Sequence, residues 1–190
     1  MIKLLMSTVA MVVVATGLSY ANGFQMELEE LAAGDISGIA SSAEVIAAVK
    51  AQNEATAAFD QAKVDELDQT WRAETKAPDK PMIDAMMKND LSRYLAGEQK
   101  KSVGLFTEIF VMDAKGLNVG QSAVTSDYWQ GDEAKWQETY LKGAGAVHVG
   151  ELEQDDSTQQ LQSQVSVSVV DPDSGETIGA VTFGVNVGRL

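Results

Sequence analysis

The chain has 190 residues, which is enough for one domain with a hydrophobic core of its own. Its formal net charge of -14 argues against nucleic-acid binding, which needs lysine and arginine against phosphate, and against docking on anionic lipid. The chain contains no cysteine, which excludes disulfides and cysteine-ligated metals.

The N-terminal residues have the pattern of a secretory signal peptide. Lys3 precedes an apolar run at 4–18, and Ser19 and Ala21 supply small residues at the positions that a signal peptidase reads. The run has about 15 residues, fewer than the ~20 that span a bilayer. We therefore expect cleavage near Ala21 and a periplasmic protein, with an uncleaved anchor as the alternative. Residues 22–40 are expected to be a flexible lead, followed by a single domain at 41–190.

Residues 41–76 contain no glycine or proline and are rich in alanine, which predicts one long helix. Asp68 and Arg72 are four residues apart and can pair along it. The apolar side chains fall on one arc, so the helix should lie against another layer. They are Val45, Val49, Thr56, Phe59, Leu67 and Trp71.

A second helix should follow Pro78. Asp79 is expected to cap it, and Pro81 is tolerated in its first turn. Apolar residues recur at helical spacing until Leu95, and Gly97 is expected to end the helix.

After Gly104 the apolar period changes from 3.6 to 2, which is typical of strands. Turns are predicted at 113–116 and 171–175, and a short helix at 132–141. The strands are expected within 105–113, 117–122, 146–153, 162–171 and 177–187. Helices followed by strands indicate an α+β fold, with a five-stranded antiparallel sheet and the long N-terminal helix packed on it.

The last two strands have unlike faces. One face is apolar and consists of Val165, Val167, Val169, Val181, Phe183, Val185 and Val187. The other face is small or polar and consists of Gln164, Ser166, Ser168, Ala180, Thr182, Gly184 and Asn186. The polar face suits either a closely packed helix or a ligand cavity.

The layout of the chain resembles an extracellular Cache domain, a PAS-like sensor module. The resemblance rests on "FVMDAKGLNV", on the aromatic residues after Ser126-Asp127-Tyr128, and on "VVDPDSGETIGAVTFGVNV". It implies a pocket between one sheet face and the segment that joins the second and third strands. Such domains usually lie between two membrane helices, whereas this sequence ends directly after its last strand, at Leu190. We therefore expect a free module that passes its signal to a separate, membrane-bound partner.

The stretch "TSDYWQGDEAKW", residues 125–136, lies in that joining segment. Its rings can stack on a ligand, and its carboxylates can hold a positive group. We expect it to cover a pocket, with these ligand-binding residues: Ser126, Asp127, Tyr128, Trp129, Asp132, Trp136, Phe110, Met112 and Asp156. In the alternative interpretation Trp129 and Trp136 fill the core and Asp132 caps a helix.

The sequence gives no reason to expect catalysis, a metal or a cofactor. His148 is the only histidine, so an ordinary structural zinc site cannot form, and no serine has a recognisable His-Asp partnership.

These observations favour a noncatalytic periplasmic sensor that binds a small organic metabolite. Acidity and aromatic residues favour an amine or an amino acid. The resemblance implies a small carboxylate as the alternative ligand, since such ligands are frequent in similar domains. No arginine lies near the aromatic stretch in the sequence to clamp it, and Lys135 and Lys142 would substitute only weakly. A homodimer through the long helix is also expected. The alternatives are an interaction subunit without a small ligand and a carboxylate-based hydrolase.

Overall fold

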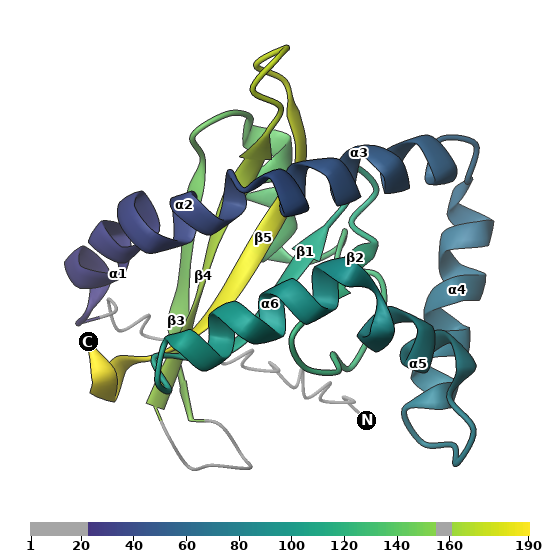
Figure 1. Cartoon of the computed structure of the whole chain (residues 1–190), viewed down its shortest axis with the longest axis horizontal. Helices are drawn as coiled ribbons and strands as arrows, with labels where there is room; N and C mark the ends of the chain where they lie inside the picture. Colours follow the sequence, from purple (N-terminus) through teal and green to yellow (C-terminus); the bar gives the residue numbers. More distant parts are fainter. Residues whose placement is uncertain (1–22, 155–160) are drawn as a thin grey trace, which may run out of the picture.

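The protein is described here from a computed structural model that covers residues 23–154 and 161–190. The expected signal peptide at 1–21 and the expected ligand residue Asp156 lie outside these ranges. One antiparallel sheet forms the centre of the fold, with α1, α2, α3 and α6 on one of its faces (Figure 1).

The five predicted strands are confirmed, and so is the α+β fold class. They are β1 (Phe106–Met112), β2 (Asn118–Gln121), β3 (Val147–Gln154), β4 (Leu161–Val170) and β5 (Thr177–Asn186). Their order in the sheet is β2-β1-β5-β4-β3, and every neighbouring pair is antiparallel. This is the PAS-like sheet that the resemblance implies.

The β1–β2 turn forms as predicted and is held by a buried carboxylate. One oxygen of Asp113 accepts from the amides of Lys115 and Leu117, at 2.8 and 2.9 Å. The other accepts from the hydroxyl of Thr56 and the side-chain amide of Gln52. Four donors therefore compensate for the desolvation of the carboxylate and dock the turn on the N-terminal helices.

The expected flexible lead at 22–40 is wrong for its larger part. The segment forms α1 (Gln25–Leu31), a π-helical turn (Ala32–Ile36) and α2 (Ser37–Ala40). Its buried side chains, Leu28, Ala32, Ile36 and Ala40, follow one another at a spacing of four residues. That spacing is wider than the 3.6 residues of an α-helical turn, and the π-helical turn keeps all four against the sheet.

The predicted long helix is broken in the middle. It consists of α3 (Ala43–Thr56) and α4 (Gln61–Glu74), and Asp60 caps α4 by accepting from the amide of Lys63 at 2.9 Å. At the break the chain turns, and α4 stands at the β2 end of the sheet (Figure 1). Among the described residues no single helix is long and apolar enough to cross a membrane, and 25–56 pass only as two helices bent by 66°.

The predicted apolar stripe of the long helix is consequently divided between two cores. Val45 and Val49 on α3 belong to the main core, under the valines of β4 and β5. Trp71 on α4 belongs to a second core, which also contains Val64 and Tyr128.

The second predicted helix is also two helices, α5 (Pro81–Lys88) and α6 (Asp90–Lys101). Asn89 separates them, because its side chain accepts from the amide of Ser92 and donates to the carbonyl of Val119, at 2.7 and 2.9 Å. Gly97 lies inside α6 and does not end it. The carboxylate of Glu74, and not that of Asp79, accepts from the first amides of α5.

The two faces of the sheet differ as the sequence indicates. The apolar face packs against α1, α2, α3 and α6. The small, polar face is covered by the one-turn helix α7 (Ala134–Gln137) and the 3-10 turn Tyr140–Lys142. The segment between β2 and β3 therefore covers the polar face, which we call the far face.

Candidate ligand-binding groove

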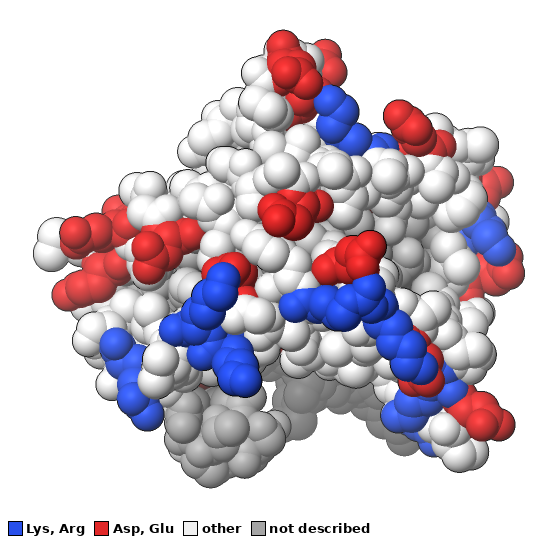
Figure 2. All heavy atoms as spheres, viewed as in Figure 1, with Lys and Arg blue, Asp and Glu red and all other residues white. Residues whose placement is uncertain are grey.

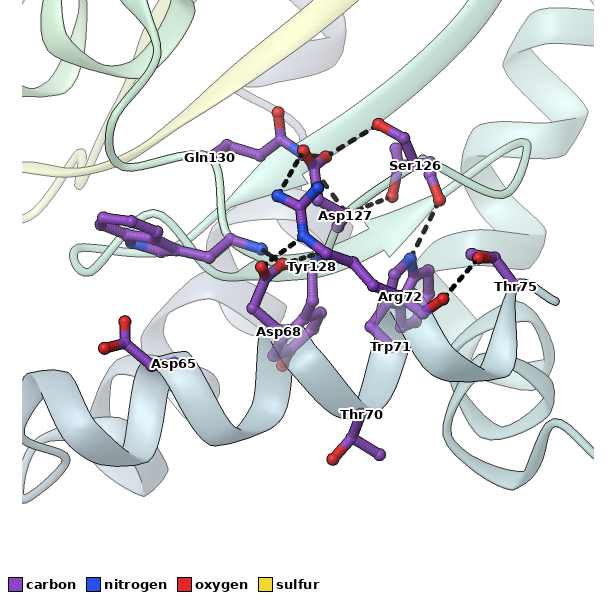
Figure 3. Close-up of polar contacts among 12 residues, drawn as sticks. Asp65, Asp68, Thr70, Trp71, Arg72, Thr75, Ser126, Asp127, Tyr128 and Gln130 are labelled. Atoms are coloured by element: carbon purple, nitrogen blue, oxygen red, sulfur yellow. Dashed lines mark hydrogen bonds and ion pairs between the residues drawn. The ribbon is translucent and has the colours of Figure 1, made fainter. Parts of the chain in front are cut away.

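The first half of the aromatic stretch is bound to α4. Asp68 accepts from the backbone amides of Tyr128 and Trp129, at 2.9 and 3.1 Å. Its second oxygen accepts from Nε of Arg72 at 2.6 Å, and Nη2 of Arg72 lies 3.0 Å from Asp127 (Figure 3). Arg72 is distant from this stretch in the sequence, but the break before α4 carries it across to Asp127.

Arg72, Asp68 and Asp127 are paired with one another, so none of their charges is left to bind a ligand. Asp68 and Asp127 are each 9% exposed, and the Asp68 hydrogen bond raises the pKa of Arg72, with both carboxylates adding to the effect. Asp127 also accepts from the side chains of Ser126 and Gln130. We conclude that Asp127 fastens the segment to α4 through Arg72, and that Ser126 supports Asp127.

Tyr128 belongs to the second core and does not face an open pocket. Its ring stacks on that of Trp71, with centroids 5.6 Å apart and an interplanar angle of 26°. Only 7% of Tyr128 is exposed, and burial raises the pKa of its hydroxyl. The indole of Trp71 donates to the carbonyl of Thr125 at 2.9 Å, so α4 and this segment share one packed interface.

Trp136 covers the far face but fills the space there. It is 9% exposed and clusters with Phe110, Met112 and Ala180. Its indole donates to the carbonyl of Asp113 at 3.0 Å and stacks on Tyr140, with centroids 4.9 Å apart. Phe110 and Met112 are 2% and 0% exposed, so packing occupies the surface expected to meet a ligand.

The predicted site residues therefore do not form one pocket. Trp129 and Trp136 border one hollow that Tyr128, Phe110 and Met112 do not line, and the indole of Trp129 donates to the carbonyl of Lys115. Asp132 is exposed and does not cap α7, whose N-cap is Glu133. In the alternative, Trp129 and Trp136 fill the core: Trp136 is buried, as is Tyr128, whereas Trp129 is partly exposed.

An open groove remains on the far face, beside the start of α7. It lies between α7 and strands β3 and β4 and has a volume of about 320 Å³. We call it the α7 groove; it is lined by Glu133, Ala134, Lys135, His148, Val149, Gly150, Glu151, Glu153 and Gln164.

Lys135 places a fixed positive charge on the α7 side of the groove. Its ammonium lies 2.8 Å from Glu133 and 3.2 Å from the side-chain oxygen of Gln130. It also lies 5.4 Å from the centroid of the Phe110 ring, which is a cation–π distance. The side chain is only 13% exposed, so the charge is held in place and poorly screened by water.

The strand side of the groove supplies neutral and acidic groups. Burial lowers the pKa of His148 below its usual 6.5; Glu138 opposes this shift and Lys135 adds to it, and the net lowering leaves the imidazole mainly neutral at pH 7. Gln164 donates to Glu108 at 3.0 Å, and Glu151 and Glu153 stand on the edge strand β3. A cation, an imidazole, an amide and carboxylates thus surround one hollow, and together they can bind an ammonium and a carboxylate.

A larger hollow of about 540 Å³ lies on the other side of the molecule, between residues 34–39 and α6. On that side Lys and Arg gather over α6 and Asp and Glu over α1 (Figure 2), so charges of both signs border this hollow. Within its lining Lys101 pairs with Glu98 at 2.7 Å. We favour the α7 groove because the segment between β2 and β3 forms its wall.

Sequence reasoning missed most of the groove residues. The alternation along β4 predicts Gln164 on the polar face, whereas nothing in the sequence singles out His148 or Lys135 as groove residues. The orientation of a one-turn helix over a sheet is a tertiary property without a periodic signal. Within the described ranges no three His, Asp or Glu side chains gather as metal ligands would.

Comparisons with known proteins give structural neighbours only. No protein-family model matches the chain, and no curated protein matches it. The structural neighbours include the ligand-binding domain of the Pseudomonas aeruginosa PAO1 amino acid chemoreceptor PctC, in complex with GABA, and the E. coli DcuS sensor domain. A third is the sensor domain of the V. cholerae histidine kinase DctB.

The overlap with each of the three is broad but distant. Identity is 16% in all three, and the TM-scores are 0.47, 0.45 and 0.38 for PctC, DcuS and DctB. The matches cover 85%, 86% and 87% of this chain. They cover 54% of the PctC domain, 94% of the DcuS domain and 58% of the DctB domain, so the chain spans about half of the first.

Proposed function

We propose that the chain is an exported, noncatalytic sensor module that binds a small molecule in the α7 groove. The observation that carries the proposal is the ammonium of Lys135, held at the wall of an open hollow on the far face. The resemblance to Cache domains points to the same face. The signal-peptide pattern at 1–21 supports a periplasmic location.

The ligand class that fits the groove is a small amino acid or a related amine. Lys135 and the neutral imidazole of His148 suit a carboxylate, and Glu151 and Glu153 suit an ammonium group. A plain carboxylate would meet three glutamates against one lysine, which disfavours it.

The response to a ligand would be a movement of α7 against the sheet. Tyr128 and Trp129, which precede α7, are hydrogen-bonded to Asp68 of α4, so the movement would be restricted to residues 132–142. Gly143 and Gly145 follow with φ of 97° and 80° and space around them, which suits a hinge. A separate membrane-bound partner would read this change. The expected homodimer contact is limited to the outer face of α3, because the long helix is broken.

Binding is tested by thermal unfolding of the exported protein against a panel of amino acids, amines and small carboxylates. A ligand present at 100-fold over its dissociation constant should add about 2.7 kcal/mol to the free energy of unfolding. Lys135→Met should weaken that ligand about ten- to hundred-fold, because a charged hydrogen bond is lost. The matched control is Lys142→Met, since Lys142 is 58% exposed, pairs with Glu138 and does not line the groove.

The second candidate function is an interaction subunit without a small ligand. The packing of Tyr128 on Trp71 and of Trp136 on Tyr140 favours it. If no panel member stabilises the protein, the interaction subunit is the better interpretation. If Lys135→Met and Lys142→Met bind a ligand equally well, that ligand binds outside the α7 groove and the proposed site is wrong.

A further inference from the structure

A further hollow shares no lining residue with the α7 groove, although Trp136 of α7 borders it. It has a volume of about 320 Å³ and lies between the start of α4, the β1–β2 turn and the aromatic stretch. We call it the tryptophan hollow; it is lined by Phe59, Asp60, Gln61, Val64, Lys115, Trp129, Gly131 and Trp136. Two of the three tryptophans of the chain thus line one hollow, together with a phenylalanine.

Both indoles are fixed to the same turn. Trp129 donates to the carbonyl of Lys115 at 2.8 Å, and Trp136 donates to the carbonyl of Asp113 at 3.0 Å. Gly131 leaves room for the Trp129 ring, because a Cβ there would lie 2.4 Å from its Nε1. The aromatic wall is therefore built before any ligand arrives, which lowers the entropy cost of binding.

The break between α3 and α4 supplies the opposite wall. In a continuous helix Phe59 would stay in the stripe of α3, whereas here it lies in the bend, partly exposed and in contact with the second core. Asp60 follows as the cap of α4 and brings a carboxylate to the rim. Lys115, from the turn, also lines the hollow, so the two charged residues of the lining are one acid and one base.

From this lining we propose that the tryptophan hollow is a second binding site, for a small zwitterion that carries a methylated ammonium group. Aromatic rings attract a weakly hydrated quaternary ammonium, and Asp60 adds charge of the favourable sign. Lys115 pairs with the carboxylate of the same molecule. This site does not depend on the α7 groove holding a ligand.

The test is isothermal calorimetry of the unmodified protein with two probes of the same shape. Glycine betaine carries the quaternary nitrogen, and 3,3-dimethylbutyrate has carbon at that atom and no positive charge. Betaine should bind about ten-fold or more tightly than the isostere. Equal affinities, or no binding of betaine, would overturn the proposal without any variant.

Variants then assign the site. Trp129→Leu should abolish most betaine binding, and Trp129→Phe should retain part of it, because a ring remains. Lys115→Met should weaken betaine more than choline, which lacks the carboxylate, and Lys88→Met is the control, since Lys88 pairs with Asp84 on α5 outside the hollow. Unchanged betaine affinity in a folded Trp129→Leu protein would place the binding elsewhere and refute the site.

Discussion

At the scale of single residues, Arg72 joins the aromatic stretch to α4 through two ion pairs. It lies between Asp68 and Asp127, which are nearly buried, whereas Arg72 itself is about half exposed. The spacing of Asp68 and Arg72 predicts their pairing, which is confirmed. The contact with Asp127 spans 55 residues of sequence and has no local signal.

Arg72→Met should destabilise the protein by about 1 to 3 kcal/mol, because two poorly hydrated carboxylates lose their shared cation. The exposure of Arg72 keeps the loss in this range. Denaturant unfolding measures it, and Arg93→Met serves as the control, since the Arg93–Asp90 pair is exposed and should matter by less than about 0.5 kcal/mol. Equal effects of the two substitutions would show that the cluster does not hold the segment.

At the scale of elements, helix type was predictable but helix ends were not. Alanine-rich sequence without glycine or proline indicates helix through 41–76, yet Asp60 caps a new helix there. Asn89 does the same between α5 and α6. A side chain that can cap a helix does not by itself predict where a helix begins. It starts a new helix only where tertiary packing stabilises a change in chain direction.

The sequence predicts a helix that ends at Gly97, whereas the observed α6 continues through Gly97 to Lys101. Gly97 lies in the helix interior without a positive φ, and a Cβ there would meet no atom within 4 Å. Gly97→Ala should therefore stabilise the protein by about 0.5 to 1 kcal/mol in denaturant unfolding. A glycine that ended the helix in the left-handed region would give the opposite sign.

Gly116→Ala is the matched counter-example. Gly116 has a φ of 80°, and a Cβ there would lie 2.6 Å from Gly131. This substitution should destabilise the protein by more than about 1 kcal/mol, through both strain and overlap. Stabilisation by both alanines would contradict the description of these two elements.

At the scale of the whole molecule, the sheet was predictable because strand periodicity and turn residues are local. The valine faces of β4 and β5 and the turns at Asp113 and Asp171 indicate five antiparallel strands, as found. The site was not predictable in the same way. Its walls come from α7, β3 and β4, and whether Trp136 fills a space or borders one depends on packing between distant segments.

The most direct test of the proposed sensor function uses the only histidine of the chain. His148 lines the α7 groove, so NMR signals of its imidazole report on that groove alone. In the free protein its pKa should lie below 6.5. A saturating amino acid from the panel should shift these signals and raise that pKa, because its carboxylate favours the imidazolium. Signals and a pKa that stay unchanged while a ligand is bound would contradict binding in the α7 groove.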